Sequence, residues 1–504
     1  MDRTLARRLL AAGLAIGLVA EVLLVGSAYG VNVPVLIGLI LGAGWLVRRR
    51  GATLDRLDAW LPATAVALAL FVAVRGDPLL ALLNSSASLA FAGAALVAMS
   101  GTPVTRRSAS MVTTMAVLAT VAASVGLVSV IRAARPVSGT RLRLLPGHLA
   151  PVGRGLFLAV PLAVIFVTLF SSADPIFRQG LEDVLGWQVN LDYLVTRVLF
   201  ALAVAWFVTG MLATAAVGMQ DSRIEPLESA RSLGAAARTP AMALTATLGV
   251  AEALVVLVVV DVVVGLFVAL QVAYLFGGQD TLVAAGLTYS AYARRGFFEL
   301  VAATGLAGLI IVVLEGVVAH RSRSYLAALM VLLGLTGVVL ASAALRLRLY
   351  QDAYGWTELR LYVLTTIVTM AAGLILMTAL AGLGRMRWLG HGLAGLVVVT
   401  LIGLNLLAPG AFVAARNVER AVDPSLVAPG GETRLDPEYL GVLPDDAIPV
   451  LVEALPRLPE GDRAAVVRLL LERRDELESN PAFASPGSWN LGRERARSAL
   501  ESLR

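Results

Sequence analysis

Residues 248–276 read LGVAEALVVLVVVDVVVGLFVALQVAYLF, and residues 289–299, after a short connection, read YSAYARRGFFE. The first segment is an apolar run interrupted by Glu252 and Asp261, and the second leads directly into another apolar run. An ionisable side chain costs roughly 2.5–3.5 kcal/mol at the centre of a bilayer, so it usually faces a bundle interior or a water-filled cavity. We therefore expect these residues to form the functional centre of a membrane protein.

The composition of the chain is that of a membrane protein with many spans. Of its 504 residues, 58% are hydrophobic and 15% are charged, and the mean hydropathy is +0.81. Soluble domains are about half apolar and about a quarter charged. Apolar runs of about 20 residues, each long enough to cross a bilayer, recur along the chain. The sequence predicts an all-α polytopic transmembrane helical bundle of about 12 spans with a small helical C-terminal module.

The chain divides into three predicted parts. Residues 1–151 contain about five transmembrane helices, and residues 152–420 contain about seven. Residues 421–504 form a linker and a small helical tail. Residues 408–504 hold 12 Arg and 16 acidic residues, so the tail is acidic whereas the remainder of the chain is basic. This change of composition separates the tail from the membrane part.

The tail has helical spacing of apolar residues in three segments, 447–455, 463–478 and 492–503. Asp445 and Asp446 directly precede the first segment, and acidic residues at such a position are typical of a helix N-cap. We expect a compact module that packs on the membrane helices or on a partner protein.

Turn residues and arginines give information on how the chain crosses the membrane. Arg75-Gly76-Asp77-Pro78 joins two apolar runs and is typical of a helical hairpin. Twelve spans would put both ends of the chain on one side. The positive-inside rule leaves the side of the tail unresolved, with a slight lean to the cytoplasm, because the arginines at residues 48–50 and 106–107 would then be cytoplasmic. Residues 132–143 oppose this assignment, since their arginines would lie outside. The alternative is that the hairpin at Arg75–Asp77 re-enters the membrane instead of spanning it twice.

Glu252 and Asp261 are the two acids of the central apolar run. They are nine residues apart, which is about 180° around an ideal helix, so they cannot share one cavity on a straight helix. From Ala241 to Phe276 the run would extend about 54 Å as a helix, longer than a bilayer core. We expect it to tilt, to begin in the interface or to break near Gly249 or Gly265. The two acids are either a proton or cation relay, a polar substrate site, or contacts between helices.

The second segment places polar side chains at helical spacing. Arg295 and Glu299 are four residues apart and share a helix face, with Tyr292 one turn earlier. Arginine is suited to phosphate, so this face could bind an anionic headgroup; the alternative is an interfacial anchor. The predicted polar site comprises Glu252, Asp261, Gln271, Tyr274, Tyr289, Tyr292, Arg294, Arg295 and Glu299. Secondary candidates are Asp174, Glu315 and Glu21.

Several functional classes are poorly supported by the residues. The chain has no cysteine and three widely separated histidines, and it contains no HExxH, P-loop or GxSxG motif. We therefore predict no catalytic residue, no metal site and no cofactor. The net charge of +6 is explained by the positive-inside bias, so nucleic acid is not an expected partner. The expected partners are membrane lipids and a protein that binds the tail.

Several short sequence segments between Val152 and Arg420 resemble the bacterial multi-pass membrane family catalogued as domain of unknown function 4173, related to 4153. The matching residues are Ser172-Ala173-Asp174-Pro175, Gln271, Tyr274 to Gly278, Tyr289, Tyr292 to Glu299, Arg346 to Arg348, Tyr350, Tyr354-Gly355, Thr357, Arg360, Asn405, Pro409 and Arg416-Asn417. The resemblance implies a multi-pass protein of the bacterial cytoplasmic (inner) membrane. It implies no activity, substrate or catalytic residue.

Three hypotheses for function follow from these observations. The first is transport or channel-like handling of a small molecule, an ion or a lipid through the predicted polar site. The second is a non-catalytic envelope or signalling scaffold that recruits a partner through its tail. The third is a membrane-embedded transferase, although the absence of enzyme motifs favours a protein without catalytic activity.

Overall fold

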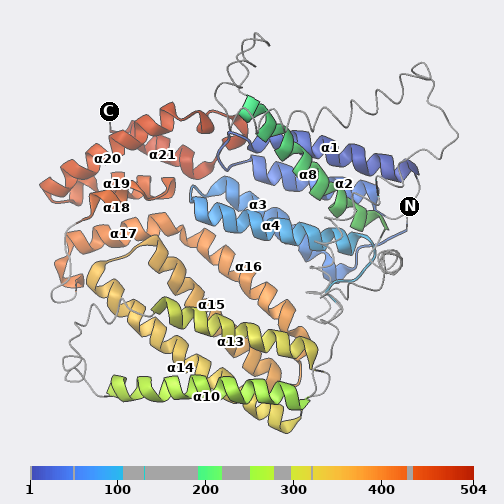
Figure 1. The fold of residues 1–504 in the computed structure, drawn as a ribbon. Coiled ribbons are helices and arrows are strands. Elements are labelled where there is room, and N and C mark those ends of the chain that lie inside the picture. The colour runs from blue at the N-terminus through green and yellow to red at the C-terminus, as the bar shows by residue number, and fades with distance from the viewer. Residues whose placement is uncertain are drawn as a thin grey trace, which may run out of the picture.

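The computed structural model describes residues 3–48, 51–105, 130, 191–217, 250–276, 297–318, 322–427 and 435–503. Every regular element in these residues is a helix, which confirms the all-α class. The helices form three groups, each with its own apolar core: a first bundle, a second bundle and a tail module (Figure 1).

The first bundle owes its tightest packing to small residues. It consists of α1 (Arg3–Leu24), α2 (Asn32–Val47), α3 (Trp60–Val74), α4 (Pro78–Met99) and α8 (Leu191–Val217). Gly13 and Gly17 of α1 face Ala205 and Thr209 of α8, where a Cβ atom would have no room. Two small residues four apart allow helix backbones to approach closely, which is a major source of packing energy in membranes.

The second bundle packs around one long helix. It consists of α10 (Val250–Phe276), α13 (Phe297–Val317), α14 (Arg323–Tyr354), α15 (Glu358–Gly382) and α16 (Leu389–Leu407). Leu329, Leu332 and Leu347 of α14 are fully buried in its core. Within the described residues α10 is continuous through Gly265, so the break considered there does not occur.

Seven helices among the described residues are long and apolar enough to cross a membrane. They are Arg56–Val74, Pro78–Met99, Arg197–Ala216, Val250–Ala269, Arg323–Asp352, Glu358–Gly382 and Leu389–Leu407. The chain is therefore a multi-pass membrane protein. The count of about twelve is not confirmed, since both predicted membrane regions, 1–151 and 152–420, contain long stretches outside the described residues.

The predicted hairpin between α3 and α4 is confirmed. Both helices are long enough to cross a membrane, and Arg75, Gly76 and Asp77 form the turn between them. Asp77 is the N-cap of α4, where its Oδ1 accepts a hydrogen bond from Leu80 N–H at 3.0 Å. Pro78 occupies the first helical position, where the absence of an N–H group does no harm.

The tail module begins where the chain bends sharply at Ala408, which has φ of 53°. It consists of α17 (Pro409–Val422), α18 (Pro437–Gly441), α19 (Ile448–Ala454), α20 (Glu460–Ser479) and α21 (Leu491–Glu501). The last three confirm the helices predicted from apolar spacing. The predicted N-cap at Asp445 and Asp446 is wrong: both lie in a short 3-10 helix, Asp445–Ala447, and Ala447 is the cap residue of α19. Both carboxylates contact other parts of the protein.

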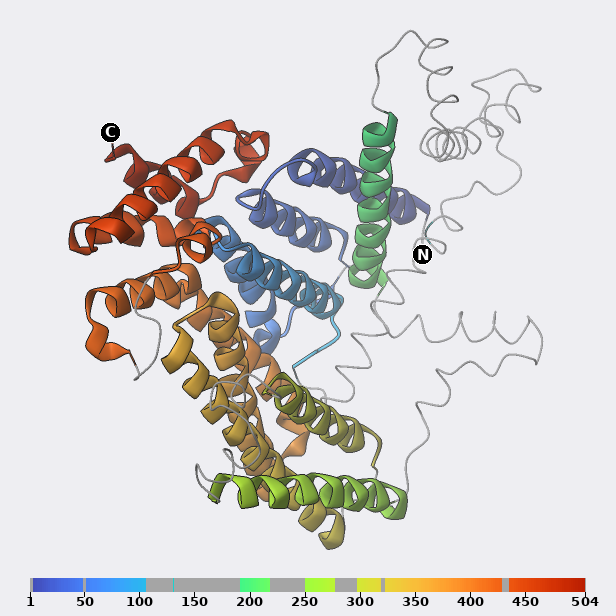
Figure 2. The same cartoon turned by 60° about the vertical axis from the view of Figure 1, so that its left-hand side comes forward.

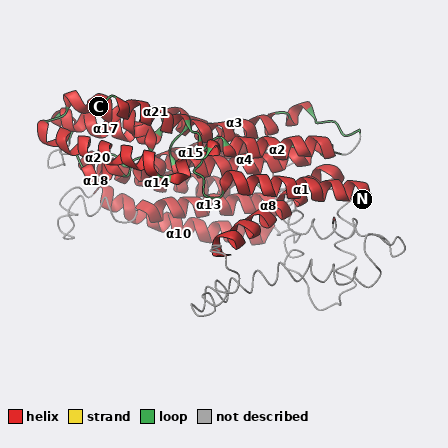
Figure 3. Ribbon diagram, turned by 90° about the horizontal axis from the view of Figure 1, so that it is seen from above, coloured by secondary structure: helices red, strands yellow, loops and turns green. Residues whose placement is uncertain are grey.

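The tail module and the amino-terminal end of α1 lie at opposite ends of the membrane helices. The α1–α2 turn is bonded to the tail, because Ala28 and Val31 N–H donate to the carbonyl oxygens of Ala482 and Trp489, each at 3.0 Å. Arg3 is at the far end of α1, and Figure 3 shows the N and C labels at opposite ends. The first residues of α1 are therefore remote from the tail module.

The close approach of α1 and α8 gives a test of the first bundle. A valine side chain at Gly17 would collide with the Ala201 carbonyl, so Gly17→Val should destabilise the protein by about 1–3 kcal/mol. Gly38→Val is the matched control, since no heavy atom lies within 4 Å of a Cβ atom at Gly38. Thermal unfolding of the purified protein should show a lower midpoint for Gly17→Val alone. Equal midpoints for both variants would contradict this packing.

Candidate functional site: a polar junction between tail and membrane helices

Most of the predicted polar site lies where the structure describes no side chains. Gln271 and Tyr274 lie on α10 and Glu299 lies on α13, with backbone positions alone described. Four further members and one secondary candidate lie outside the described residues: Tyr289, Tyr292, Arg294, Arg295 and Asp174. For these residues the site stays a prediction.

The two acids of α10 point in different directions. Glu252 is exposed, whereas Asp261 is half-buried on the stripe that also holds Ala253 and Leu257 and packs on α14. The Asp261 Oδ1 atom is enclosed and has no hydrogen-bond partner within the described part of the chain. The helix is continuous, so the two acids do not converge on one cavity there.

Two secondary candidates, Glu21 and Glu315, contact neighbouring helices. Glu21 of α1 forms an ion pair with Arg197, the first residue of the membrane-spanning part of α8. Glu315 Oε1 accepts a hydrogen bond from the hydroxyl of Tyr325 at 2.9 Å, across the α13–α14 connection. Both contacts hold helices together, which is one of the roles of a polar group at membrane depth.

Among the described residues, a group of buried polar side chains lies elsewhere, where the tail module meets the α3–α4 hairpin. We call it the polar junction and define it by Arg75, Asp77, Glu358, Tyr362, Asn405, Tyr439, Asp445, Asp446, Asn490 and Arg493. These residues come from the hairpin tip, α15, α16 and four segments of the tail.

The hairpin tip supplies hydrogen bonds to both the tail and the second bundle. Gly76 N–H donates to Asp446 Oδ2 at 2.8 Å, and a guanidinium nitrogen of Arg75 is 3.8 Å from Asp446 Oδ1. Arg75 also donates through Nε to the carbonyl oxygen of Asn405 at 2.6 Å. A methyl group at Gly76 would contact Asp445, so the close approach requires glycine.

Asp446 is an acid that burial drives toward its protonated form. Burial raises the pKa of this carboxyl, and the bond from Gly76 N–H and the charge of Arg75 offset the increase only in part. Asp445 and Asp77 raise the pKa further because they add negative charge nearby. The junction therefore favours a proton among its carboxyl groups.

The start of α15 brings a third carboxyl group to the junction. Thr357 caps α15, and Glu358 N–H donates to the hydroxyl of Tyr439 at 2.7 Å. Glu358 lies close enough to Asp77 and Asp446 to be affected by both charges, and its Oε1 atom is enclosed without a hydrogen-bond partner in the described part of the chain. Burial raises the pKa of Tyr439 to about 12, so this hydroxyl remains protonated at neutral pH.

Tyr362, one turn further along α15, donates its hydroxyl hydrogen to Asp77 Oδ2. Asp77 is 2% exposed and uses its other oxygen to cap α4, so both oxygens are hydrogen-bonded. This bond joins the second bundle to the hairpin of the first.

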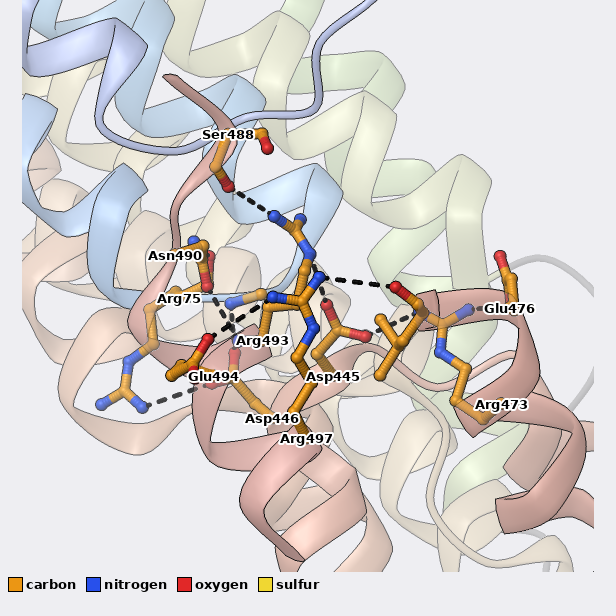
Figure 4. Close-up of polar contacts among 12 residues, drawn as sticks. Arg75, Asp445, Asp446, Arg473, Glu476, Ser488, Asn490, Arg493, Glu494 and Arg497 are labelled. Atoms are coloured by element: carbon orange, nitrogen blue, oxygen red, sulfur yellow. Dashed lines mark hydrogen bonds and ion pairs between the residues drawn. The ribbon is translucent and has the colours of Figure 1, made fainter. Parts of the chain in front are cut away.

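Asp445 pairs with two arginines inside the tail module (Figure 4). Its Oδ1 is 2.7 Å from a guanidinium nitrogen of Arg473, and its Oδ2 is 3.3 Å from Nε of Arg493. Arg493 also donates to the carbonyl oxygen of Ser488 at 2.6 Å and lies over the ring of Phe483. Removing one partner of such a buried pair leaves an uncompensated charge, which is strongly destabilising.

Asn490 joins the tail to the end of α3. Its Nδ2 donates to the carbonyl oxygens of Val72 and Arg75, both at 2.8 Å, and its Oδ1 caps α21 by accepting from Arg493 N–H at 3.1 Å. The last carbonyl groups of a helix have no partner inside that helix. Asn490 therefore satisfies groups of α3 that the tail would otherwise bury unpaired (Figure 4).

A reciprocal asparagine pair connects the two bundles beside the junction. Asn84 of α4 and Asn405 of α16 each donate Nδ2 to the other's Oδ1, at 2.9 and 3.0 Å. Both side chains are fully buried. The pair links α4 to the last turn of α16, close to the bend at Ala408.

Several residues that carry the family resemblance meet at the same end of the protein. Asn417 accepts from Trp356 N–H at 3.0 Å and donates to the Trp356 carbonyl oxygen at 2.8 Å. Arg360 donates to the carbonyl oxygens of Tyr354 and Gly355 and lies over the ring of Tyr350. These contacts satisfy the end of α14, where Gly355 has φ of 78°.

Sequence reasoning did not identify this junction, because its members lie in turns and are hundreds of residues apart. The hairpin tip was interpreted as a turn, and Asp445-Asp446 as a helix cap. The sequence feature that pointed to this end of the protein was a set of residues shared with the resembling family: Thr357, Arg360, Asn405 and Asn417. Among the described residues, no group of three His, Asp or Glu side chains is arranged to hold a metal ion. Hydrogen bonding and proton binding are the chemistry that this geometry supports.

Substitution of Asp446 tests the electrostatics of the junction. Because the pKa of the docked carboxyl is raised, docking should be strongest below the ordinary Asp pKa of about 3.9 and should weaken as the pH rises through the raised value. Asp446→Asn keeps an acceptor for Gly76 N–H and should reduce this pH dependence. Asp446→Ala leaves that N–H unpaired and should cost about 1–3 kcal/mol.

The readout is the rate at which trypsin releases the tail from the purified protein across a pH series. The wild type should lose its tail faster at higher pH, Asp446→Asn should vary less, and Asp446→Ala should be cleaved fastest at low pH. An unchanged pH profile in Asp446→Asn would mean that another group controls docking.

Comparison with protein families places the chain in one of them. The family model described as Domain of unknown function (DUF4153) matches residues 63–454, from α3 to the end of α19. No curated protein and no solved structure matched the chain. The sequence had been found to resemble domain of unknown function 4173 and, as its relative, domain 4153. The family match supports 4153. The matched region covers more than half of the chain, which therefore belongs to the DUF4153 family.

Proposed function

We propose that this protein transports a small molecule, an ion or a lipid by moving its two membrane bundles relative to each other. The observation that supports this proposal is the kind of contact between the bundles. Each bundle has a separate apolar core, and buried polar bonds join them near the tail: Asn84 with Asn405, Arg75 with the Asn405 carbonyl, and Tyr362 with Asp77.

Buried polar contacts between two helical bodies are suited to opening and closing. Apolar packing at native density resists displacement, whereas hydrogen bonds between matched amides can be exchanged for water when the bodies separate. Transporters commonly work by rocking one helical body against another. In Figure 2 both bundles reach the tail module, which contacts both and is positioned to limit their relative motion.

The cellular location and the narrower family assignment are also part of this proposal. We propose the bacterial cytoplasmic membrane as the location, supported by the resemblance to bacterial families of that membrane. Membership of the narrower 4173 family stays a prediction. Asp261 supplies a polar group on the face of α10 that packs on α14, where a solute site would need one.

Cross-linking tests the motion directly, because the chain has no cysteine of its own. Cysteines at Asn84 and Asn405 should allow a short thiol cross-linker to join the bundles. Cysteines at Ala65 and Ser88 provide the control, since Ser88 donates to the Ala65 carbonyl oxygen inside the first bundle at 2.6 Å. The readout is recovery of the solute and lipid content of cells that lack the endogenous protein.

Both cysteine pairs should restore that content before cross-linking. After cross-linking, the pair between the bundles should lose activity and the control pair should keep it. If the cross-linked Asn84–Asn405 pair still restores wild-type content, movement between the bundles is not required and the transport proposal fails.

A scaffold that recruits a partner through the tail is the second candidate. The tail module has its own apolar core, and Val442 on its surface is 73% exposed. Val442→Asp changes this surface without altering the junction. Loss of function in this variant, with normal membrane insertion and an intact junction, would favour the scaffold over transport.

A further inference from the structure

The two faces of the membrane part differ in arginine content. We call the end of the helices that contacts the tail the tail face; it includes the α1–α2 turn, the α3–α4 hairpin tip and the α14–α15 turn. The opposite end, which we call the distal face, includes the first turns of α1 and the α2–α3 and α15–α16 connections. The direction of α1 defines both faces, because its second end is bonded to the tail.

Arginines are concentrated at the distal face. Those in the described residues are Arg3, Arg7, Arg8, Arg48, Arg56, Arg323, Arg385 and Arg387. Asp55 and Asp58 are the acids of the α2–α3 connection.

The tail face has fewer arginines among the described residues: Arg75, Arg346, Arg348 and Arg360, with Arg416 and Arg420 directly after the last span. Acids lie close to them in the sequence, whereas the distal connections are mostly basic. Residues 25–31 contain no charge at all. Arg75 is bound to Asn405 and Asp446, and Arg360 is bound to two carbonyl oxygens at the end of α14. Arg346 and Arg348 lie in the last turns of α14, and acids accompany this face at Asp77, Asp352 and Glu358.

We infer that the distal face is cytoplasmic and that the tail module and the polar junction lie on the external side of the membrane. Arginines in short connections are retained on the cytoplasmic side, and the first helix usually dominates orientation. Three arginines precede the apolar part of α1, which holds its first residues inside. From the sequence alone, the even number of predicted spans had put the arginine-rich first residues and the tail on one side.

This assignment determines the kind of partner that the tail can meet. An external tail is reached by solutes, envelope components or proteins outside the cytoplasm, and not by cytoplasmic signalling proteins. The carboxyl groups of the junction also face the compartment whose pH follows the surroundings. The assignment depends on the direction of the helices and not on the transport proposal, so either can fail without the other.

Single cysteines in this cysteine-free chain test the orientation. Ser479→Cys places a thiol on the exposed end of α20 in the tail, and Thr53→Cys places one on the exposed α2–α3 connection. Intact cells without a permeability barrier outside the membrane are treated with a membrane-impermeant maleimide, before and after permeabilisation. Ser88→Cys, buried between α3 and α4, is the control for misfolded protein.

We expect Ser479→Cys to be labelled equally before and after permeabilisation, and Thr53→Cys to be labelled only afterwards. The reverse pattern would place the tail in the cytoplasm and overturn the inference. Labelling of both thiols in intact cells would indicate mixed orientation and would also overturn it. Fusions after Leu503 provide an independent measurement: alkaline phosphatase should be active there, and green fluorescent protein should be dark.

Discussion

The architecture depends on hydrogen bonds between the α3–α4 hairpin tip and the tail module. Docking the tail removes Gly76 N–H and the carbonyl oxygens of Val72 and Arg75 from water, which would cost roughly 1–3 kcal/mol for each group left unpaired. Asp446 and Asn490 supply the missing partners. Because the same turn also bonds to Asn405 and Tyr362, one short segment determines how the tail and both bundles fit together.

This constraint connects the electrostatics of the polar junction to the docking of the tail. Asp77, Glu358 and Asp446 place three carboxyl groups close together, and burial raises the pKa of the Asp446 carboxyl. Arg75 is 3.8 Å from Asp446 and partly offsets that increase. Negative charges on neighbouring carboxyl groups repel each other, and a proton on Asp446 relieves this repulsion. Docking of the tail on the hairpin should therefore depend on pH.

The helices were largely predictable from the sequence, and the junction was not. Hydropathy and apolar spacing depend on neighbouring residues, so the membrane class, the hairpin at Arg75–Pro78 and the three last tail helices were predictable. Asp446 meets Gly76 across 370 positions, and periodicity carries no information about such a contact. The acids of α10 were predicted to be functional because they interrupt an apolar run, yet Glu252 is exposed. Asp77 is buried, but its position in a turn gave no sign of this in the sequence.

Amide hydrogen exchange of the full chain in lipid nanodiscs tests the central claim most directly. The Gly76 amide is bonded to Asp446 beneath the tail, whereas the amides of residues 52–54 lie in an open connection at the distal face. The account predicts slow exchange at Gly76 and fast exchange at residues 52–54, although both segments are turns between membrane helices. Exchange at Gly76 as fast as at residues 52–54 would show that the tail does not rest on the hairpin, and would contradict the account.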